Sequence, residues 1–414
     1  MLAELIIVAY RLLGNIFIWP LCLVLQRYPN FSSTILQRLA IDIAPAPEGK
    51  NVIWVHASSV GEVKAIEGLI HAIKKSWPQM HIYLSTMTAT GRQVASKIEG
   101  VDRIFAFPFD LDWVMQRYMK IIKPSMLVIV ETEIWPNLIL AARRYGVPVF
   151  FVNARMRQES YNQYKLFTFA LRKLLQDVHV LAIAGDDAQR FTKLGAGEVE
   201  VVGNLKFDAV GAADPDKAAR TRKELGLDAR PVFIAGSVRE GEERFVVDAI
   251  AYACEHIPGL FSLVAPRHPE SIDVITRALN EKSLSWEFKS SYERDNADVL
   301  VVDTVGELFD LYGASDVAFV GGSLIDLGGQ NILEPVSWGV PTLHGPFMSN
   351  FNWALDAIQG NTVIVKTPQD LALLMVECFR NIDIYTQLGL KAQERLNTHR
   401  GITERYVHIL QTQL

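Results

Sequence analysis

The chain lacks the features that mark several common classes of protein. Only three of its 414 residues are cysteines, and they stand far apart at Cys22, Cys254 and Cys378. They predict neither a disulfide framework nor a cluster of metal ligands, and they suit a reducing, cytosolic environment. The sequence also contains no P-loop, no Gly-x-Gly-x-x-Gly motif and no Cys-x-x-Cys pair. The commonest nucleotide and redox motifs are therefore excluded.

An excess of positive charge is also absent. Lysine and arginine number 41 against 46 aspartates and glutamates, which gives a formal net charge of −5 at pH 7. This balance argues against a general nucleic-acid binder, which is usually basic. The composition, with 50% hydrophobic and 21% charged residues, is that of a folded protein. The length predicts about two domains, at roughly 100–200 residues for each.

Apolar residues are concentrated near the N-terminus, in the run Leu5–Leu25. Neither a charged n-region nor a small-residue cleavage site marks it as a secretory signal. Its length is close to the ~20 residues that span a bilayer, whereas the polar interruptions at Arg11 and Asn15 suit a helix lying in the interface. Pro20 would kink such a helix. A buried first helix is the third interpretation. We expect membrane attachment, with Arg27 and Arg38 on the cytoplasmic side.

Short apolar runs alternate with helical patterns along the rest of the chain. This alternation predicts two successive α/β domains with parallel sheets, and a ligand in their shared cleft at the carboxyl ends of the strands. The predicted strands are Val52–His56, Ile82–Thr86, Arg103–Phe107, Met126–Val130, Val149–Asn153, Val180–Ala184 and Val199–Val202, and then Val232–Ala235, Phe261–Ala265, Val299–Val302, Val317–Val320 and Thr342–Leu343.

Composition also predicts the boundaries between these parts. Pro45–Gly49 and the polar stretch Asp208–Lys217 read as linkers. We therefore predict an anchor and linker over residues 1–45, one domain over 46–207 and a second over 208–367. A helical tail over 368–414 could pack back on the first domain.

The second predicted domain carries a glycine-rich loop, Gly321–Gly329, between a buried strand and a predicted helix over Asn331–Trp338. Free backbone N–H groups at such a junction suit a phosphate. Glu334, one turn into that helix, could accept two hydrogen bonds from a ribose diol. These features together predict a nucleotide site. Gly236–Glu242, at an earlier strand end, is a second candidate for anion binding.

In the first domain, acidic residues stand where two predicted strands end. Glu62, which follows His56–Gly61, could be a general base or a first-turn residue that complements the helix dipole. Ser58 and Ser59 could be simple N-caps. Glu131 and Glu133 follow the fourth strand, where one could stabilise charge and the other cap a helix.

Other charged residues leave more than one interpretation open. Lys206 could reach a phosphate or be a solvated surface residue. Asp110-Leu111-Asp112 fits the Asp-x-Asp pattern of metal-dependent transferases, but a three-residue pattern arises easily by chance. One basic stretch could face anionic lipid or a phosphorylated acceptor, or form a solvated helix face. It contains Arg143, Arg144, Arg155, Arg157, Lys165, Arg172 and Lys173.

These motifs, and the order in which they occur along nearly the whole chain, resemble those of one protein family. The apolar N-terminus is followed by Ser-Val-Gly-Glu at Glu62, Glu-Thr-Glu-Ile-Trp-Pro-Asn from Glu131 and Asn-Leu-Lys-Phe-Asp around Lys206. Pro-Arg-His-Pro, Gly-Glu-Leu and Asn-Ile-Leu-Glu follow, starting at residues 266, 306 and 331. This set is similar to the 3-deoxy-D-manno-octulosonic acid (Kdo) transferases of lipopolysaccharide assembly.

The resemblance implies a GT-B glycosyltransferase with two Rossmann-like domains facing across a cleft, the first for the acceptor and the second for the nucleotide sugar. It implies inverting transfer of Kdo from CMP-Kdo to lipid IVA, at the cytoplasmic face of the inner membrane. Glu62 would be the base, and Glu131 and Lys206 would stabilise the transition state. No metal or other cofactor is expected. The implied CMP site comprises Pro266, Arg267, Gly306, Glu307, Leu308, Asn331, Ile332, Leu333 and Glu334.

Two other functions fit the same architecture. A sugar-nucleotide epimerase would share the two domains and a glutamate on the nucleotide ribose, but it needs no membrane anchor. A non-catalytic lipid-binding protein would not need Glu62, Glu131 and Lys206 together. Transfer of Kdo is therefore the leading interpretation.

Overall fold

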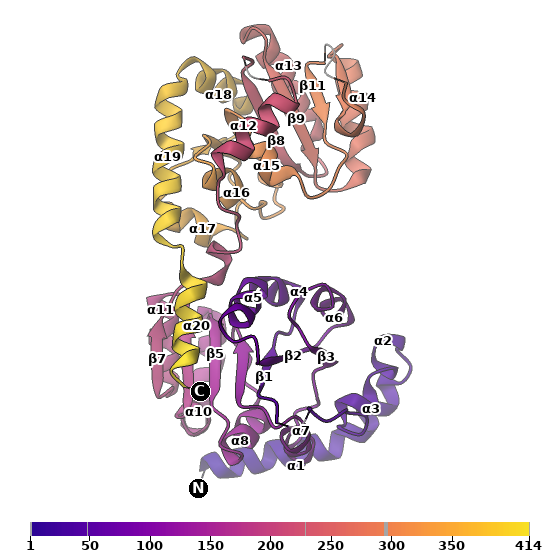
Figure 1. Cartoon of the computed structure of the whole chain (residues 1–414), viewed down its shortest axis with the longest axis vertical. Coiled ribbons are helices and arrows are strands. Elements are labelled where there is room, and N and C mark those ends of the chain that lie inside the picture. The colour runs from indigo at the N-terminus through magenta and orange to yellow at the C-terminus, as the bar shows by residue number, and fades with distance from the viewer. Residues whose placement is uncertain (1, 48, 228, 294–296, 414) are drawn as a thin grey trace. The chain divides into compact units, whose positions relative to one another are not determined.

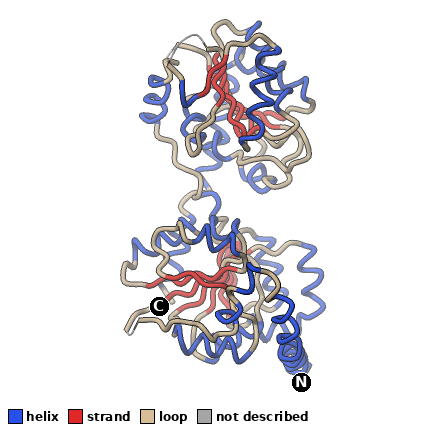
Figure 2. Tube along the Cα trace, turned by 90° about the vertical axis from the view of Figure 1, so that its right-hand side faces the viewer, coloured by secondary structure: helices blue, strands red, loops and turns tan. Residues whose placement is uncertain are grey.

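The computed structural model describes residues 2–47, 49–227, 229–293 and 297–413 as two α/β units. Unit 1 comprises the described residues up to Ala209 and those from Gly401 onward, and unit 2 spans Val210–Arg400. The predicted linker at Pro45–Gly49 includes Glu48, which lies outside the described residues. Each unit has a sheet of strands flanked by helices (Figure 2).

Unit 1 is built on a parallel sheet with the strand order β3-β2-β1-β4-β5-β6-β7. The order reverses between β1 and β4, and open sheets of this kind bind ligands beside the carboxyl ends of the two strands at such a point. The strands are β1 (Val52–His56), β2 (His81–Thr86), β3 (Arg103–Ala106), β4 (Met126–Val130), β5 (Val149–Ala154), β6 (Val178–Ala182) and β7 (Glu198–Val201).

Helices connect these parallel strands, because each strand must be reached by a crossover. Those of unit 1 are α1 (Leu2–Leu25), α2 (Pro29–Ser32), α3 (Ile35–Arg38), α4 (Val60–Ala65), α5 (Glu67–Ser76), α6 (Ala89–Ala95), α7 (Asp112–Ile122), α8 (Pro136–Arg144), α9 (Gln158–Tyr164), η1 (Lys165–Phe167), α10 (Thr168–Leu175), α11 (Gly185–Leu194), η2 (Leu205–Phe207) and α20 (Ile402–Gln411), where η marks a 3₁₀-helix.

Unit 2 repeats this design with the strand order β10-β11-β9-β8-β12-β13-β14. Its order reverses between β8 and β12. The strands are β8 (Val232–Val238), β9 (Phe261–Pro266), β10 (Trp286–Phe288), β11 (Val299–Val301), β12 (Val317–Val320), β13 (Thr342–His344) and β14 (Val363–Ile364). The helices are α12 (Pro215–Glu224), α13 (Glu243–His256), η3 (Pro269–Ser271), α14 (Ile272–Glu281), η4 (Lys289–Ser291), α15 (Leu308–Gly313), α16 (Leu333–Ser337), α17 (Asn352–Ala357), α18 (Pro368–Arg380) and α19 (Ile382–Thr398).

The apolar helix α1 lies along unit 1 (Figure 1). Ile7, Ile18 and Cys22 pack into the core of the unit. Gly14 permits a close approach, since a Cβ at this position would lie 3.0 Å from Cδ2 of Leu111. Much of the remaining helix surface is apolar and exposed, at Leu5, Val8, Leu12, Leu13, Ile16, Phe17, Trp19, Leu21, Leu23 and Val24.

Several local predictions differ from the structure. Arg38, which was expected as a charge on the cytoplasmic side of the membrane, is 2% exposed and donates to the carbonyls of Met87 and Phe107 inside unit 1. The predicted linker at Asp208–Lys217 runs into α12, because the Asp214 side chain accepts backbone N–H groups and caps this helix. In the predicted C-terminal tail, α18 and α19 belong to unit 2 and α20 belongs to unit 1.

Candidate active site

Glu62 lies in the first turn of α4, just after the carboxyl end of β1. Ser59 is the N-cap of this helix, since its Oγ accepts the backbone N–H of Glu62 at 3.3 Å and also donates to the Glu62 carboxylate at 3.0 Å. The backbone N–H of Ser58 donates to the other carboxylate oxygen at 2.6 Å. The capping role therefore falls to Ser59, and the Glu62 carboxylate is held at the point where the strand order reverses.

Two more carboxylates follow β4, the strand that pairs with β1. Glu131 has φ of +58°, a left-handed conformation that turns the chain sharply out of the strand. Oε2 of Glu133 accepts from Nε1 of Trp135 at 2.8 Å and lies 3.1 Å from Nε2 of His56. The pairing of β1 with β4 thus brings the charges of Glu131 and Glu133 close enough to raise the pKa of the Glu62 carboxyl group.

Lys206, on the 3₁₀-helix η2, reaches the carboxylates that follow β4. Its backbone N–H donates to the Asn204 side chain at 3.1 Å, and the neighbouring N–H of Leu205 donates to Oδ1 of Asn153 at 3.0 Å. These bonds tie η2 to the end of β5. The Nζ atom of Lys206 lies 3.8 Å from Oε1 of Glu131, so two of the predicted catalytic side chains form an ion pair.

The carboxylates of this group differ in their affinity for a proton. Burial raises the pKa of Glu62 to about 7, against the hydrogen bonds from Ser58 and Ser59, and the nearby charges of Glu131 and Glu133 add to the rise. Burial would raise the pKa of Glu133 as well, but its hydrogen bonds outweigh this effect and lower it. A base works best when its pKa is near the operating pH, so Glu62 is the better suited of the two.

The residues predicted to bind the nucleotide come from three loops of unit 2. Pro266 ends β9 and Arg267 follows it, residues 306–308 follow β11, and residues 331–334 follow β12. Gly306 has φ of +94°, a conformation that favours glycine. The side chains of Ile332 and Leu333 are fully buried, so only their backbone groups are available to a ligand.

Glu334 is the most enclosed charged residue of this set. Burial raises its pKa, while a 3.0 Å hydrogen bond from Nδ2 of Asn331 and the charge of Arg267 oppose the rise. Arg267 follows β9 and Glu334 follows β12, so the sheet brings an acidic and a basic group together across 67 positions of sequence (334 − 267). Such a pair can hold a ligand that carries both hydroxyl groups and negative charge.

The glycine-rich loop after β12 is not the open anion site that its sequence suggests. Glu242 is fully buried, and its carboxylate accepts the backbone N–H groups of Gly322, Ser323 and Leu324 at 2.5–2.8 Å and that of Arg239 at 3.2 Å. A carboxylate of the protein thus occupies three of the backbone donors at the start of this loop. The following helix α16 is also shorter than expected, since it covers only Leu333–Ser337.

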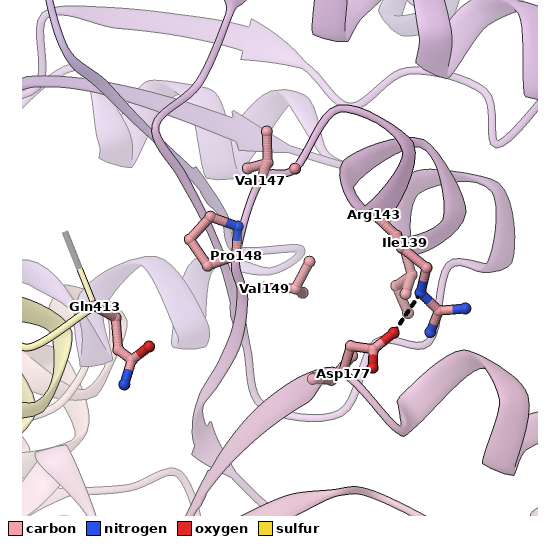
Figure 3. Close-up of a pocket in the computed structure, with 9 residues that line it drawn as sticks. Ile139, Arg143, Val147, Pro148, Val149, Asp177 and Gln413 are labelled. Carbon is pink, nitrogen blue, oxygen red and sulfur yellow. Dashed lines mark ion pairs between the residues drawn. The ribbon is translucent and has the colours of Figure 1, made fainter.

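A cavity of about 390 Å³ lies elsewhere in unit 1 (Figure 3). Pro148 and Val149 line it at the start of β5, and an ion pair of 2.6 Å joins Nε of Arg143 to Asp177 at its edge. It is therefore at the amino ends of the strands, opposite the predicted catalytic residues. Ligands of open α/β sheets bind at the carboxyl ends, so we do not assign the active site to this cavity.

His56, Trp135 and Asp110, for which the sequence indicated no catalytic role, support the loop after β4. The contacts of His56 and Trp135 with Glu133 depend on the pairing of β1 with β4. Asp110, which was set aside as a chance Asp-x-Asp match, accepts the backbone N–H groups of Asn137 and Leu138 at 3.0 and 2.8 Å and caps α8. No local pattern predicts the contacts of His56 and Asp110, because each joins segments that are distant in sequence.

Comparison with known proteins identifies one family. Residues 33–209 match the family model described as 3-deoxy-D-manno-octulosonic-acid transferase (kdotransferase). The chain is 34% identical, over 388 residues, to the 3-deoxy-D-manno-octulosonic acid transferase of Bordetella pertussis. The match covers 89% of this chain and 88% of that protein.

Solved structures show the fold. A glycosyltransferase from Rickettsia africae is similar with a TM-score of 0.56 at 13% identity, over 88% of this chain and 99% of its own. A UDP-GlcNAc 2-epimerase from Neisseria meningitidis is similar with a TM-score of 0.56 at 15% identity, over 87% of this chain and 100% of its own. The predicted GT-B glycosyltransferase fold is confirmed. At such identities the likeness extends to the fold alone and does not favour an epimerase.

Proposed function

The chain belongs to the 3-deoxy-D-manno-octulosonic acid transferases, and from this premise we propose that it moves Kdo, with inversion, from CMP-Kdo to a hydroxyl group of lipid IVA. The observation that carries the chemical part of the proposal is the placement of the Glu62 carboxylate, which Ser58 and Ser59 hold beyond the carboxyl end of β1. Burial there, with the charges of Glu131 and Glu133, raises its pKa to about 7. The epimerase alternative has support only from the fold.

The proposed reaction begins at Glu62. Its carboxylate removes the proton of the acceptor hydroxyl as the oxygen attacks the anomeric carbon of Kdo. The sugar then gains oxocarbenium character, and the negative charge of Glu131 offsets it. The bond to CMP breaks and the leaving phosphate takes the electron pair. Lys206 and Arg267 offset that negative charge, and with these cations the proposal requires no metal.

Transfer itself is tested with the two proposed substrates. The purified protein is incubated with CMP-Kdo and lipid IVA, and the lipid product is analysed by mass spectrometry. We expect the lipid to gain the mass of one or more Kdo residues, with release of CMP. An unchanged lipid, alongside a related transferase that modifies the same preparation, would contradict the proposed function.

We also propose that α1 attaches the enzyme to the cytoplasmic face of the inner membrane. This helix is long and apolar enough to cross a membrane, judged by length and composition. The polar residues Tyr10 and Arg11, near its middle, bond to Asp110, Asp112 and Asn137 of unit 1. A helix that crossed the bilayer would carry these bonds into hydrocarbon, so we favour a helix that lies in the interface with its exposed apolar face in the lipid.

Polar substitutions on the exposed face of α1 test this attachment. Ile16 and Phe17 are 64% and 61% exposed, so Ile16→Asn with Phe17→Asn should leave the fold intact and weaken binding to anionic vesicles roughly tenfold, since apolar burial in the lipid is lost. Flotation with vesicles measures the bound share. The matched control is Ile384→Asn in α19, 69% exposed, which should bind as the unchanged protein does. Equal binding of all three proteins would contradict the role of α1.

A further inference from the structure

The polar residues of α1 reach the base of the loop that carries Glu131 and Glu133. The hydroxyl of Tyr10 donates to Oδ2 of Asp110 at 2.9 Å. Nε of Arg11 donates to Oδ1 of Asn137 at 2.9 Å, and its guanidinium pairs with Asp112, the first residue of α7, at 2.6 Å. The membrane helix is therefore joined to two helices of the catalytic unit.

These contacts meet at the first turn of α8. Asn137 is fully buried, and its Nδ2 donates to the backbone carbonyl of Asp110 at 2.6 Å while its Oδ1 accepts from Arg11. The carboxylate of Asp110 accepts the backbone N–H groups of Asn137 and Leu138. Loss of Arg11 would leave the buried Asn137 oxygen without this donor, which is more costly than loss of an exposed bond.

The first turn of α8 in turn positions the acidic loop. Trp135 is the N-cap of α8, and its indole N–H donates to Glu133. Its ring also lies against Phe107, with the ring centroids 4.9 Å apart, and Phe107 stacks on His56 at 3.8 Å. A continuous set of contacts thus runs from Arg11 through Asn137 and α8 to Glu133.

We propose that α1 is a positioning element of the active site as well as an anchor: Arg11 and Tyr10 fix the start of α8 and, through it, the loop that places Glu131 and Glu133 beside Glu62. This inference rests on the proposed function, in which Glu62 is the base. It assigns to Arg11 and Tyr10 an effect on turnover that is separate from attachment to the membrane.

The test measures turnover in detergent micelles that contain lipid IVA, where attachment to a bilayer does not limit the reaction. Arg11→Met removes the donor to Asn137 and keeps an apolar stem of similar length. We expect kcat to fall about 5–10-fold, because small displacements of catalytic groups are costly. KM for CMP-Kdo should be unchanged. The pH at which kcat falls on the acidic side of its pH profile should also shift, because displacement of the loop moves the charges of Glu131 and Glu133 that affect the pKa of Glu62.

Controls separate positioning from general loosening of α1. Glu4→Gln breaks the ion pair of 2.7 Å between Glu4 and Lys173, another bond from α1 to unit 1, without touching α8. It should leave kcat and the pH profile unchanged. Arg11→Lys should recover part of kcat, since lysine can still donate to Asn137. Tyr10→Phe removes only one hydroxyl group and provides the test if Arg11→Met does not fold.

The outcomes distinguish this inference from the proposed function. A folded Arg11→Met variant with unchanged kcat and an unmoved acidic limb would overturn the positioning role, whatever Glu62 does. An equal fall in kcat for Glu4→Gln would overturn it too, because the effect would then follow from any loosening of α1. Normal turnover of Glu62→Gln would instead overturn the proposed base.

Discussion

Replacement of Glu62 by glutamine is expected to lower kcat by about 10²–10⁴-fold, the usual contribution of a positioned general base. Glutamine keeps the length and shape of the side chain, and its amide oxygen can still accept a hydrogen bond from Ser58 or Ser59. The main loss is therefore the negative charge and the basicity of the carboxylate. Binding of CMP, measured by calorimetry, should change little, because the residues proposed to bind the nucleotide belong to unit 2.

The pH profile gives the same prediction an independent readout. The base must be ionised to accept a proton, and the pKa of Glu62 is raised from 4.5 to about 7. Turnover of the unchanged enzyme should therefore rise about tenfold per pH unit below pH 7 and level off above it. An acidic limb near pH 4.5 would show that the base lies in a less buried environment.

The Glu62→Gln variant is not expected to lose activity through unfolding. A carboxyl group whose pKa is raised in the folded state stabilises the fold below pH 4.5, and this contribution is lost as the pH rises through about 7. At pH 8 the neutral amide therefore costs no stability relative to the carboxylate, and Tm should be maintained. If this folded variant transferred Kdo at a normal rate, Glu131 or Glu133 would become the candidate base.

Removal of the Glu334 carboxylate should weaken binding of CMP by about 1.5–3 kcal/mol, which is the contribution of hydrogen bonds to a charged group. This corresponds to a dissociation constant roughly 10–150 times larger for Glu334→Ala. The reason is that the carboxylate is proposed to accept both ribose hydroxyls, with Asn331 and Arg267 holding it in place. Calorimetric titration with CMP measures the change directly.

Two further variants make this measurement specific. Glu334→Gln retains one good acceptor and should lose less affinity than Glu334→Ala. Glu281→Ala, on α14 of the same unit, removes an exposed carboxylate that pairs with Arg244 and should bind CMP as the unchanged protein does. A folded Glu334→Ala variant with unchanged affinity would remove Glu334 from the nucleotide site.

The sequence predicted the sheets well because their signal is local. A buried parallel strand is an apolar run bounded by polar residues, so β1, β4 and β12 have their predicted limits. The short strands β10 and β14 were missed, since three and two residues at a sheet edge make too little pattern. The break at Ile66, which divides one helical stretch into α4 and α5, was not predicted either, because it depends on packing rather than on a local pattern.

The site was predictable only where a residue follows a strand. Glu62, Glu131 and Glu334 could be placed at sheet edges from the alternation of strands and helices. The ion pair of Glu131 with Lys206 could not, because it depends on how η2 is tied to the end of β5. The bonds of Glu242 to the glycine-rich loop could not be predicted for the same reason, since these partners lie 80–82 residues away.

The return of the chain to unit 1 at Gly401 bears on how the protein is made. Tyr406 of α20 is fully buried, and its hydroxyl contacts the backbone of Asn153, Leu181 and Gly203 at the ends of three strands. On the ribosome the N-terminal residues emerge first, yet the core of unit 1 is completed by residues that are translated after the whole of unit 2. Unit 2 is one continuous stretch of the chain, so all of its residues have been translated before the last segment of unit 1 begins at Gly401. Domains fold as units once their residues are available, so the second unit can finish folding before the first.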